Sequence, residues 1–259
     1  MKSNNILIIK MKVFTVTAKG GRPYQEDRSV TFKYMYNTTI WVVSCMFDGH
    51  GSADVSQFLE DNIEKVFKHV FTNYGHHDIP TSLRKLYSLL DDQIKTLTIK
   101  NNGSTATITI ITPSKVYVSN IGDSEAFVAL SSSKKPIVMT IEDKVESETE
   151  RIIKAGGKIE YSSGMARIHG LNLSRSFGDD YVKKWVISEP HIRTISTKNI
   201  DFIYQATDGI WDVLTHNSVY DIITAVPKSK RDKVLVENTI HAALRGGSMD
   251  NITATLITF

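Results

Sequence analysis

Alternating apolar and polar residues occur along much of the chain and predict β-strands. The clearest case is the segment 105–110, Thr-Ala-Thr-Ile-Thr-Ile, which places threonines on one face and apolar residues on the other. Alternation alone would place Thr105 on the exposed face of its strand. Between two strands, Ile121-Gly122-Asp123 is typical of a hairpin turn. The predicted strands are residues 12–17, 39–47, 105–111, 115–120, 124–130, 191–195, 201–207 and 251–259.

Helical periodicity appears in blocks between these strands. The third block ends at Ala155-Gly156-Gly157, where a glycine can cap the C-terminus of a helix. Helices and strands do not alternate strictly, as they would around a parallel sheet, so antiparallel sheets covered by helices are expected. We expect one domain over residues 1–259, with residues 1–10 as a loose extension. The predicted helices are residues 55–71, 83–97, 145–155, 217–225 and 230–244.

Composition and charge narrow the class of protein. The chain has 259 residues, 41% of them hydrophobic, and a net charge of +3 with acids and bases interspersed. This balance predicts neither nucleic acid nor membrane as a partner. The single cysteine cannot form an internal disulfide, which fits a reducing compartment. The apolar run 6–9 is shorter than the roughly 7–15 residues of a secretory signal. We expect a soluble, intracellular protein in the cytoplasm, with the nucleus as the alternative location.

Carboxylates follow the ends of several predicted strands. Taken alone, each such stretch is better explained as a turn, because Asp-Gly and Asp-Asn are common turn dipeptides. Together they place several acids at strand ends of one domain, and closely grouped carboxylates need cations because they repel one another. Ligand sets of oxygen atoms suit Mg²⁺ or Mn²⁺. These acids are Glu26, Asp27, Asp48, Asp208 and Asp250.

Eight short stretches, in this order, resemble the metal-dependent Ser/Thr protein phosphatases of the type 2C (PPM) class. They extend from residue 22 to residue 253, and because all eight occur in family order, chance does not explain the match. The stretches are Arg22-Pro-Tyr-Gln-Glu-Asp27, Phe47-Asp-Gly-His-Gly51, Gly103-Ser-Thr-Ala106, Asn120-Ile-Gly-Asp-Ser124, Ala155-Gly-Gly157, Leu173-Ser-Arg-Ser-Phe-Gly-Asp179, Ala206-Thr-Asp-Gly-Ile-Trp-Asp212 and Ser248-Met-Asp-Asn-Ile-Thr253.

The resemblance implies an α+β fold, a four-layer αββα arrangement in which two antiparallel sheets form a β-sandwich flanked by helix pairs. It places two Mg²⁺ or Mn²⁺ ions in a cleft at one end. Asp48 would bridge both ions, and Asp208 and Asp250 would hold the first. Glu26 and the backbone carbonyl of Gly49 would hold the second, with waters completing both octahedra.

Further residues are assigned around these ligands by the same resemblance. Asp27 would act through ligand waters, and Thr105 would lie near the cleft. Asp212 is equally compatible with a metal ligand and with a position behind the ligands. Relatives bind a weaker third ion with an aspartate of an Asp-His-Lys-Pro segment. That segment is Glu142-Asp143-Lys144-Val145 here, so Glu142 or Asp143 could take over the role.

The implied reaction is hydrolysis of phosphoserine and phosphothreonine in proteins. A metal-bridging water would attack phosphorus directly, without a phosphoenzyme. Arg22 would grip the phosphate through its planar guanidinium group, and His50 would protonate the departing oxygen. The expected enzyme is a monomeric signalling phosphatase.

Three alternatives to a metal-dependent protein phosphatase fit the sequence less well. Cys45 precedes Asp48, but a cysteine-based phosphatase requires an arginine six positions later, and residue 51 is glycine. Cys45 is therefore predicted to be a core residue. A catalytically inactive scaffold or phosphoprotein-binding relative would typically have lost the metal carboxylates, which are present here. Another phosphoester hydrolase, such as a nuclease, would show a basic groove with interleaved aromatic residues.

Besides the segment 142–145, the chain departs from the family pattern at residue 125 and in the segment 162–173. Glu125 stands where the family usually has arginine, and the sequence does not identify its partner. Arg175 is predicted to pair with a carboxylate rather than to contact substrate. The segment 162–173, where relatives carry a flap over the cleft, is short and predicts a broad or partner-dictated specificity.

Overall fold

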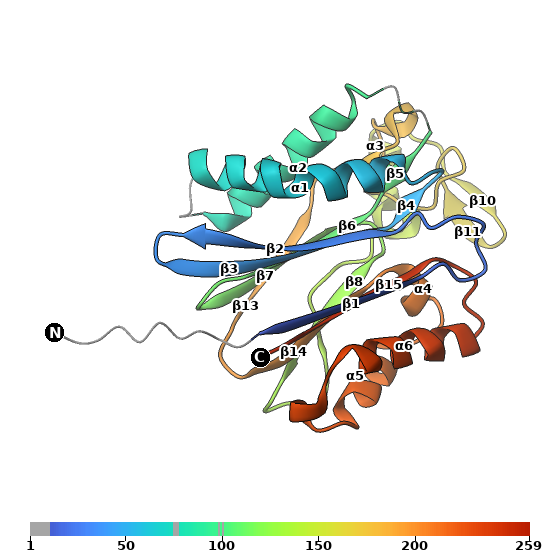
Figure 1. Ribbon diagram of the computed structural model, residues 1–259. Helices are drawn as coiled ribbons and strands as arrows, with labels where there is room; N and C mark the ends of the chain where they lie inside the picture. Colours follow the sequence, from blue (N-terminus) through green and yellow to red (C-terminus); the bar gives the residue numbers. More distant parts are fainter. Residues whose placement is uncertain (1–10, 75–77, 98, 100) are drawn as a thin grey trace.

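Two five-stranded antiparallel sheets pack face to face and carry helices on their outer faces (Figure 1). The computed structural model describes residues 11–74, 78–97, 99 and 101–259. The predicted N-terminal extension, residues 1–10, lies outside the described residues. Within them, no helix is long and apolar enough to cross a membrane.

The first sheet, called sheet I, has the strand order β13-β7-β6-β3-β2. Helices α1 and α2 cover its outer face, where they bury the apolar stripes that the sequence predicted. Asp78 caps α2 by accepting a hydrogen bond from the backbone N–H of Thr81, at 3.3 Å. These elements are β2 (Arg28–Tyr36), β3 (Thr39–Phe47), β6 (Ala106–Ile111), β7 (Lys115–Ile121), β13 (His191–Ser196), α1 (Asp54–Asn73) and α2 (Ile79–Ile94).

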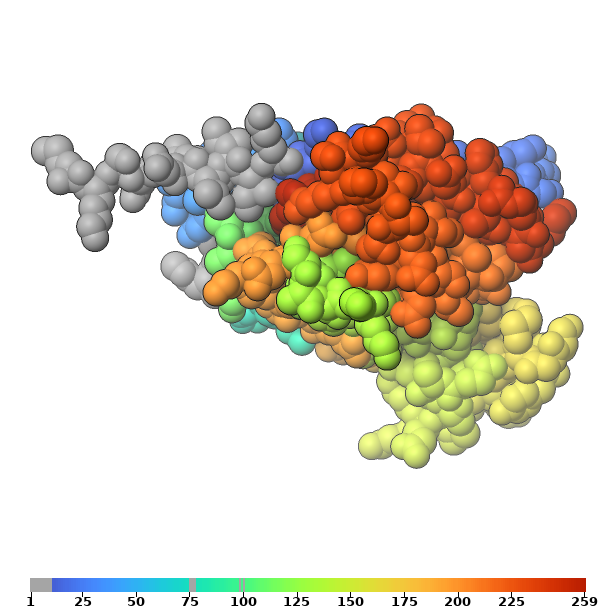
Figure 2. All heavy atoms as spheres, turned by 90° about the horizontal axis from the view of Figure 1, so that it is seen from below, coloured from blue at the N-terminus to red at the C-terminus, as the bar shows by residue number. Residues whose placement is uncertain are grey.

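The second sheet, sheet II, has the order β1-β15-β14-β8-β9 and carries α4, α5 and α6. Seen from below, α5 and α6 cover the sheet, and the yellow segment that includes β10 and β11 projects at one side (Figure 2). These elements are β1 (Lys12–Ala18), β8 (Glu125–Leu130), β9 (Ile137–Val138), β14 (Ile200–Ala206), β15 (Ile252–Thr258), α4 (Asp208–Trp211), α5 (His216–Thr224) and α6 (Lys233–Arg245).

Short elements complete the fold, several of them at the end of the sandwich that holds the candidate site. A three-stranded sheet has the order β12-β5-β4, and β10 pairs with β11. The predicted helix 145–155 consists of a 3-10 turn and α3, and it ends as predicted before Gly156, whose φ is +82°. The elements are β4 (Gly49–His50), β5 (Gly103–Ser104), β10 (Glu160–Ser162), β11 (Met165–Arg167), β12 (Phe177–Gly178), η1 (Val145–Glu148), α3 (Thr149–Lys154), η2 (Asp180–Val182) and η3 (Lys228–Lys230).

The structure corrects two local predictions and adds strands that the sequence did not predict, of which β2 is the longest. Residues 121–123 do not form a hairpin turn, because β7 belongs to sheet I and β8 to sheet II. The threonine face of β6 is buried rather than exposed, since it faces the other sheet: Thr109 Oγ1 donates to Gln205 Oε1 of β14, at 2.9 Å. Strand β2 was not predicted, although it pairs with β3 along its whole length.

Candidate metal centre

Asp48 follows the last residue of β3, at the end of the β-sandwich. Its backbone is fixed by Thr105, which is buried here, whereas alternation alone would have placed it on an exposed face. The Asp48 N–H donates to Thr105 Oγ1, at 3.2 Å, and the Thr105 N–H donates to the Asp48 carbonyl, at 2.9 Å. The carboxylate is therefore held at the end of a buried strand, in the position that the sequence predicted.

Asp208 and Asp250 reach the same end of the sandwich from sheet II. Asp208 is the first residue of α4, just after β14, and Asp250 lies two residues before β15. Carboxylate oxygens of Asp48, Asp123 and Asp208 all lie within 4.8 Å of one another, an arrangement able to hold a metal ion. The ends of β3, β7 and β14 and the start of β15, from two sheets, thus bring these acids to one small region.

Glu26 and Gly49 approach each other closely. A methyl group on Gly49 would lie 2.6 Å from the Glu26 carbonyl oxygen and 2.6 Å from Ser56 Oγ of α1, so only glycine fits. Ser56 Oγ donates to the Glu26 carbonyl, at 2.5 Å, and the Glu26 N–H donates to Asn251 Oδ1, at 2.7 Å. The Glu26 backbone is therefore fixed to α1 on one side and to the loop before β15 on the other.

The clustered acids are buried together and repel one another. Burial raises the pKa of Asp48 well above its usual range, and Asp208, Asp27 and Asp123 raise it further. Burial likewise raises the pKa of Asp208, with contributions from Asp123 and Asp212. A cation would remove this repulsion, because it stabilises the charged form of each carboxylate.

Asp27 is buried behind the ligand candidates. Burial raises its pKa to about 6, while hydrogen bonds from Thr253 and Thr207 oppose the shift. The Thr207 hydroxyl donates to Asp27 Oδ2, at 3.0 Å. Asp27 therefore ties the start of β2 to the end of β14 behind the centre.

Asp123 and Lys144 belong to the centre, although they were not predicted as site residues. Lys144 Nζ donates to Asp123 Oδ2 and lies 3.7 Å from Glu142 Oε1. Burial alone would lower the pKa of Lys144, but Asp123 and Asp208 raise it above its usual value. Lys144 also favours the charged form of Asp212, whose pKa burial raises. An ammonium group thus neutralises the side of the cluster where Asp123 and Asp212 lie.

Arg22 lies at the rim, with a half-exposed side chain. Its Nη2 donates to Asp250 Oδ2, at 2.6 Å. The guanidinium group is therefore next to a predicted metal ligand. A cation on Asp250 would compete with Arg22 for that carboxylate and would free the guanidinium group for an anion.

The predicted proton donor His50 has a partner that was not predicted. His50 Nε2 lies 2.8 Å from Asp179 Oδ2, and the Asp179 side chain is fully buried. Asp179 was noted only as the last residue of the Leu173–Asp179 stretch. No sequence signal connects residues 50 and 179, because the contact depends on strand pairing.

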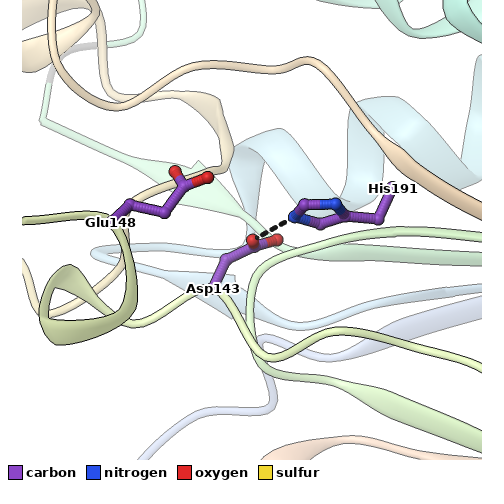
Figure 3. A group of neighbouring side chains, drawn as sticks. All are labelled: Asp143, Glu148 and His191. Atoms are coloured by element: carbon purple, nitrogen blue, oxygen red, sulfur yellow. Dashed lines mark hydrogen bonds and ion pairs between the residues drawn. The ribbon is translucent and has the colours of Figure 1, made fainter. Parts of the chain in front are cut away.

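Asp143 lies in a second cluster rather than among the acids around Asp48. Its Oδ1 accepts a hydrogen bond from His191 Nε2, at 2.8 Å, with Glu148 close by (Figure 3). Arg175 pairs with both acids: its Nε lies 3.4 Å from Asp143 Oδ1 and 3.1 Å from Glu148 Oε1. The guanidinium group already supplies the positive charge there, so this cluster has no need of a metal. The predicted pairing of Arg175 with a carboxylate is confirmed.

The structure also defines the surroundings of Cys45 and Glu125. Cys45 is buried in β3, and burial raises the pKa of its thiol, so its core role is confirmed. Glu125 has a partner that the sequence did not reveal: His216 Nε2, at the start of α5, lies 3.3 Å from Glu125 Oε2.

The residues at the first cluster fit divalent metal ions. They offer oxygen ligands, they are partly buried, and burial and mutual repulsion raise the pKa of Asp48, which a cation would oppose. Hard ions such as Mg²⁺ or Mn²⁺ prefer such carboxylate and carbonyl oxygens.

Comparison with known proteins gives a family match over most of the chain. The family model for "Protein phosphatase 2C" matches residues 26–252. "Probable protein phosphatase 2C 69" of Arabidopsis thaliana is 30% identical over 257 residues, covering 94% of this chain and 68% of that protein. "Probable protein phosphatase 2C 59" of Oryza sativa subsp. japonica is 28% identical over 224 residues, covering 83% and 65%. The chain thus spans about two thirds of the length of these relatives.

Solved structures share the fold. A serine-threonine phosphatase 2C from Toxoplasma gondii superposes with a TM-score of 0.81 at 21% identity, covering 96% of this chain and 95% of the other. A C. elegans sex determining protein superposes with a TM-score of 0.84 at 24% identity, covering 96% and 64%. The expected fold, with antiparallel sheets between helices, is confirmed.

Proposed function

The chain belongs to the protein phosphatase 2C family, and from this premise we propose that it is a metal-dependent protein serine/threonine phosphatase. The observation that carries the proposal is the grouping of carboxylate oxygens from Asp48, Asp123 and Asp208 within 4.8 Å. Its substrates would be proteins that carry phosphoserine or phosphothreonine.

The proposed metal ligands are those expected from the resemblance. Asp48 would contact two ions, Asp208 and Asp250 the first, and Glu26 with the Gly49 carbonyl the second. The close approach of Gly49 to the Glu26 backbone supports the second set. When bound, Mg²⁺ or Mn²⁺ ions supply a nucleophilic water near neutral pH and stabilise developing charge.

Two other residues would bind the phosphate group and protonate the leaving oxygen. Arg22 would bind the phosphate oxygens after leaving Asp250, its partner in this structure. His50 would donate a proton to the serine or threonine oxygen as the bond to phosphorus breaks. No phosphoenzyme is needed, and buried Cys45 is not a candidate nucleophile.

We propose two ions rather than three. Lys144 already neutralises Asp123, which lies beside Asp48 and Asp208, so a third ion on that side would compete with the ammonium group. Asp143, one of the two residues suggested for a third ion, is engaged with His191 and Arg175 instead. Glu142 stays available, 3.7 Å from Lys144 Nζ.

The proposal is tested by hydrolysis of p-nitrophenyl phosphate. We expect turnover with added Mn²⁺ or Mg²⁺ and none with excess chelator. Phosphoserine, phosphothreonine and phosphotyrosine peptides assayed side by side would then define the substrate class, with phosphotyrosine expected to be the poorest. Metal-independent turnover would refute the mechanism, and metal binding without turnover would support a phosphoprotein-binding module instead.

A further inference from the structure

His50 and Asp179 meet across the small sheet β12-β5-β4. His50 pairs with Gly103 in β5, and Gly103 pairs with Gly178, the last residue of β12. Asp179 follows Gly178 directly, so strand pairing brings both side chains over the Cα of Gly103. His50 Nε2 lies 2.8 Å from Asp179 Oδ2.

Gly103 leaves the space that this contact requires. A methyl group there would lie 2.2 Å from Asp179 Oδ2 and 2.5 Å from His50 Nε2. Both distances are too short for a carbon atom, so any side chain at this position would separate the two groups. The hydrogen bond therefore depends on a glycine in the middle strand.

The Asp179 carboxylate is fixed in place. Ser176 Oγ donates to Asp179 Oδ2, at 2.5 Å, and the Asp179 N–H donates to the carbonyl of Asn102, at 3.0 Å. The Asp179 backbone is left-handed, with φ 52° and ψ 41°, a conformation that aspartate tolerates better than most residues. The side chain is fully buried, so it is not free to turn to solvent.

Lys183 anchors the loop that carries Asp179. Its Nζ donates to the carbonyls of Ser176 and Gly178, at 2.9 and 3.0 Å. The same ammonium group lies 2.6 Å from Asp91 Oδ1 of α2. The loop is therefore tied to the helix layer of sheet I, which gives His50 a rigid partner.

We propose that Asp179 is a positioning residue for His50: its carboxylate accepts the Nε2 proton, fixes the ring and leaves Nδ1 to serve the phosphoester. This inference rests on the proposed role of His50 as proton donor. As the phosphorus–oxygen bond breaks, its electron pair moves to the serine or threonine oxygen, which takes the Nδ1 proton. The ring is left neutral with its proton on Nε2, the tautomer that Asp179 already holds.

The kinetic test compares wild type, Asp179→Asn, His50→Gln and the double variant at saturating Mn²⁺. Phenyl phosphate, with a poor leaving group, needs a proton donor more than p-nitrophenyl phosphate does. We expect Asp179→Asn to lower kcat on phenyl phosphate about 10–100-fold and on p-nitrophenyl phosphate less than about threefold, with KM unchanged. In the His50→Gln background Asp179→Asn should cause no further loss.

A purely structural role for Asp179 gives a different result. Equal losses on both substrates, or a further loss in the His50→Gln background, would overturn the inference. Should Asp179→Asn fail to fold, Ser176→Ala removes only the hydroxyl that donates to the carboxylate, and it should give a smaller loss with the same substrate dependence.

Nuclear magnetic resonance tests the inference without relying on activity. In ¹⁵N-histidine-labelled protein, with His50→Gln used for assignment, the neutral His50 ring should carry its proton on Nε2. Asp179→Asn should yield a mixture of tautomers. A wild-type ring with its proton on Nδ1, or an unchanged spectrum in the variant, would refute the inference. An inactive wild type with the Nε2 tautomer would refute the proposed function alone.

Discussion

Asp48 lies where a buried strand ends, and its neighbours determine what its carboxylate can do. Thr105 fixes the Asp48 backbone with two hydrogen bonds, while Asp208 and Asp123 place further negative charge beside the side chain. A rigid carboxylate in a field of like charge binds cations strongly, because the cation removes repulsion that the folded chain cannot relieve by moving.

Asp48→Asn should reduce metal-dependent turnover of p-nitrophenyl phosphate by more than about 100-fold. The metal-free variant should be at least as stable as wild type, since one buried charge is removed. Steady-state kinetics and thermal unfolding measure the two effects. The control Asp92→Asn, on the exposed face of α2, should change neither. Wild-type turnover in Asp48→Asn would remove the central ligand from the proposal.

Lys144→Met should increase the number or affinity of bound ions. The substitution leaves Asp123 without its ammonium partner beside Asp48 and Asp208, so an additional divalent ion can take its place. Titration calorimetry with Mn²⁺ measures the stoichiometry, and Lys144→Arg, which keeps the charge, is the matched control. Three ions on the wild type would contradict the proposed role of Lys144.

At the scale of elements, helix α2 covers the outer face of sheet I and also holds a loop of the candidate site in place. Its Asp91 pairs with Lys183, and both side chains are largely buried, so the loop between β12 and η2 is held against the helix. Burial lowers the pKa of Lys183, while Asp91 opposes the shift. A buried pair of this kind is costly to break on one side, because the remaining charge loses its partner.

Lys183→Met should therefore destabilise the protein by about 3 kcal/mol, measured by urea or thermal unfolding. Lys68→Met, which removes the exposed partner of Glu64 on α1, should cost less than about 1 kcal/mol. If the two substitutions had equal effects, the loop would not depend on its contact with α2.

At the scale of the whole molecule, acids from distant parts of the sequence share one end of the sandwich. Asp27, Asp48 and Asp208 all have raised pKa values, chiefly because of burial. The metal-free fold therefore carries unfavourable electrostatic energy that bound cations would relieve, and binding of ions to the folded chain would add to its stability by mass action.

Mn²⁺ or Mg²⁺ at about 100 times the dissociation constant should raise stability by about 2.7 kcal/mol, visible as a higher Tm. The Asp48→Asn variant should show little of this shift. A wild-type Tm that does not respond to either metal would contradict binding at this centre.

Asp27 gives the metal-free protein a specific pH dependence. Its folded pKa, about 6, is above the unfolded value of 3.8, so the folded state binds the proton more tightly. The associated stabilisation is complete below about pH 4 and is lost as pH rises through 6. Asp27→Asn should remove this dependence and should stabilise the metal-free protein above pH 7. Unfolding curves for both proteins between about pH 4 and 7 would show whether the difference has this sign.

Several predictions failed for reasons that particular residues explain. Strand β2 alternates at Val30, Phe32 and Tyr34, but Met35 on its other face obscures the pattern. The turn 121–123 separates two strands as a hairpin would, yet packing sends them to different sheets. Threonines on β6 have the polarity of a solvent-exposed face, but the Thr109 hydroxyl bonds to β14 of the opposite sheet and the Thr107 hydroxyl to Ser124, just before β8.

The sequence alone determined the strand ends that carry acids, the stripes of α1 and α2, and the family, because these depend on local periodicity and on short contiguous motifs. The tertiary structure decided which groups meet: Lys144 with Asp123, and His50 with Asp179. Such pairs lie far apart along the chain, and only strand pairing and loop packing bring their atoms within bonding distance. Local patterns contain no information about that distance.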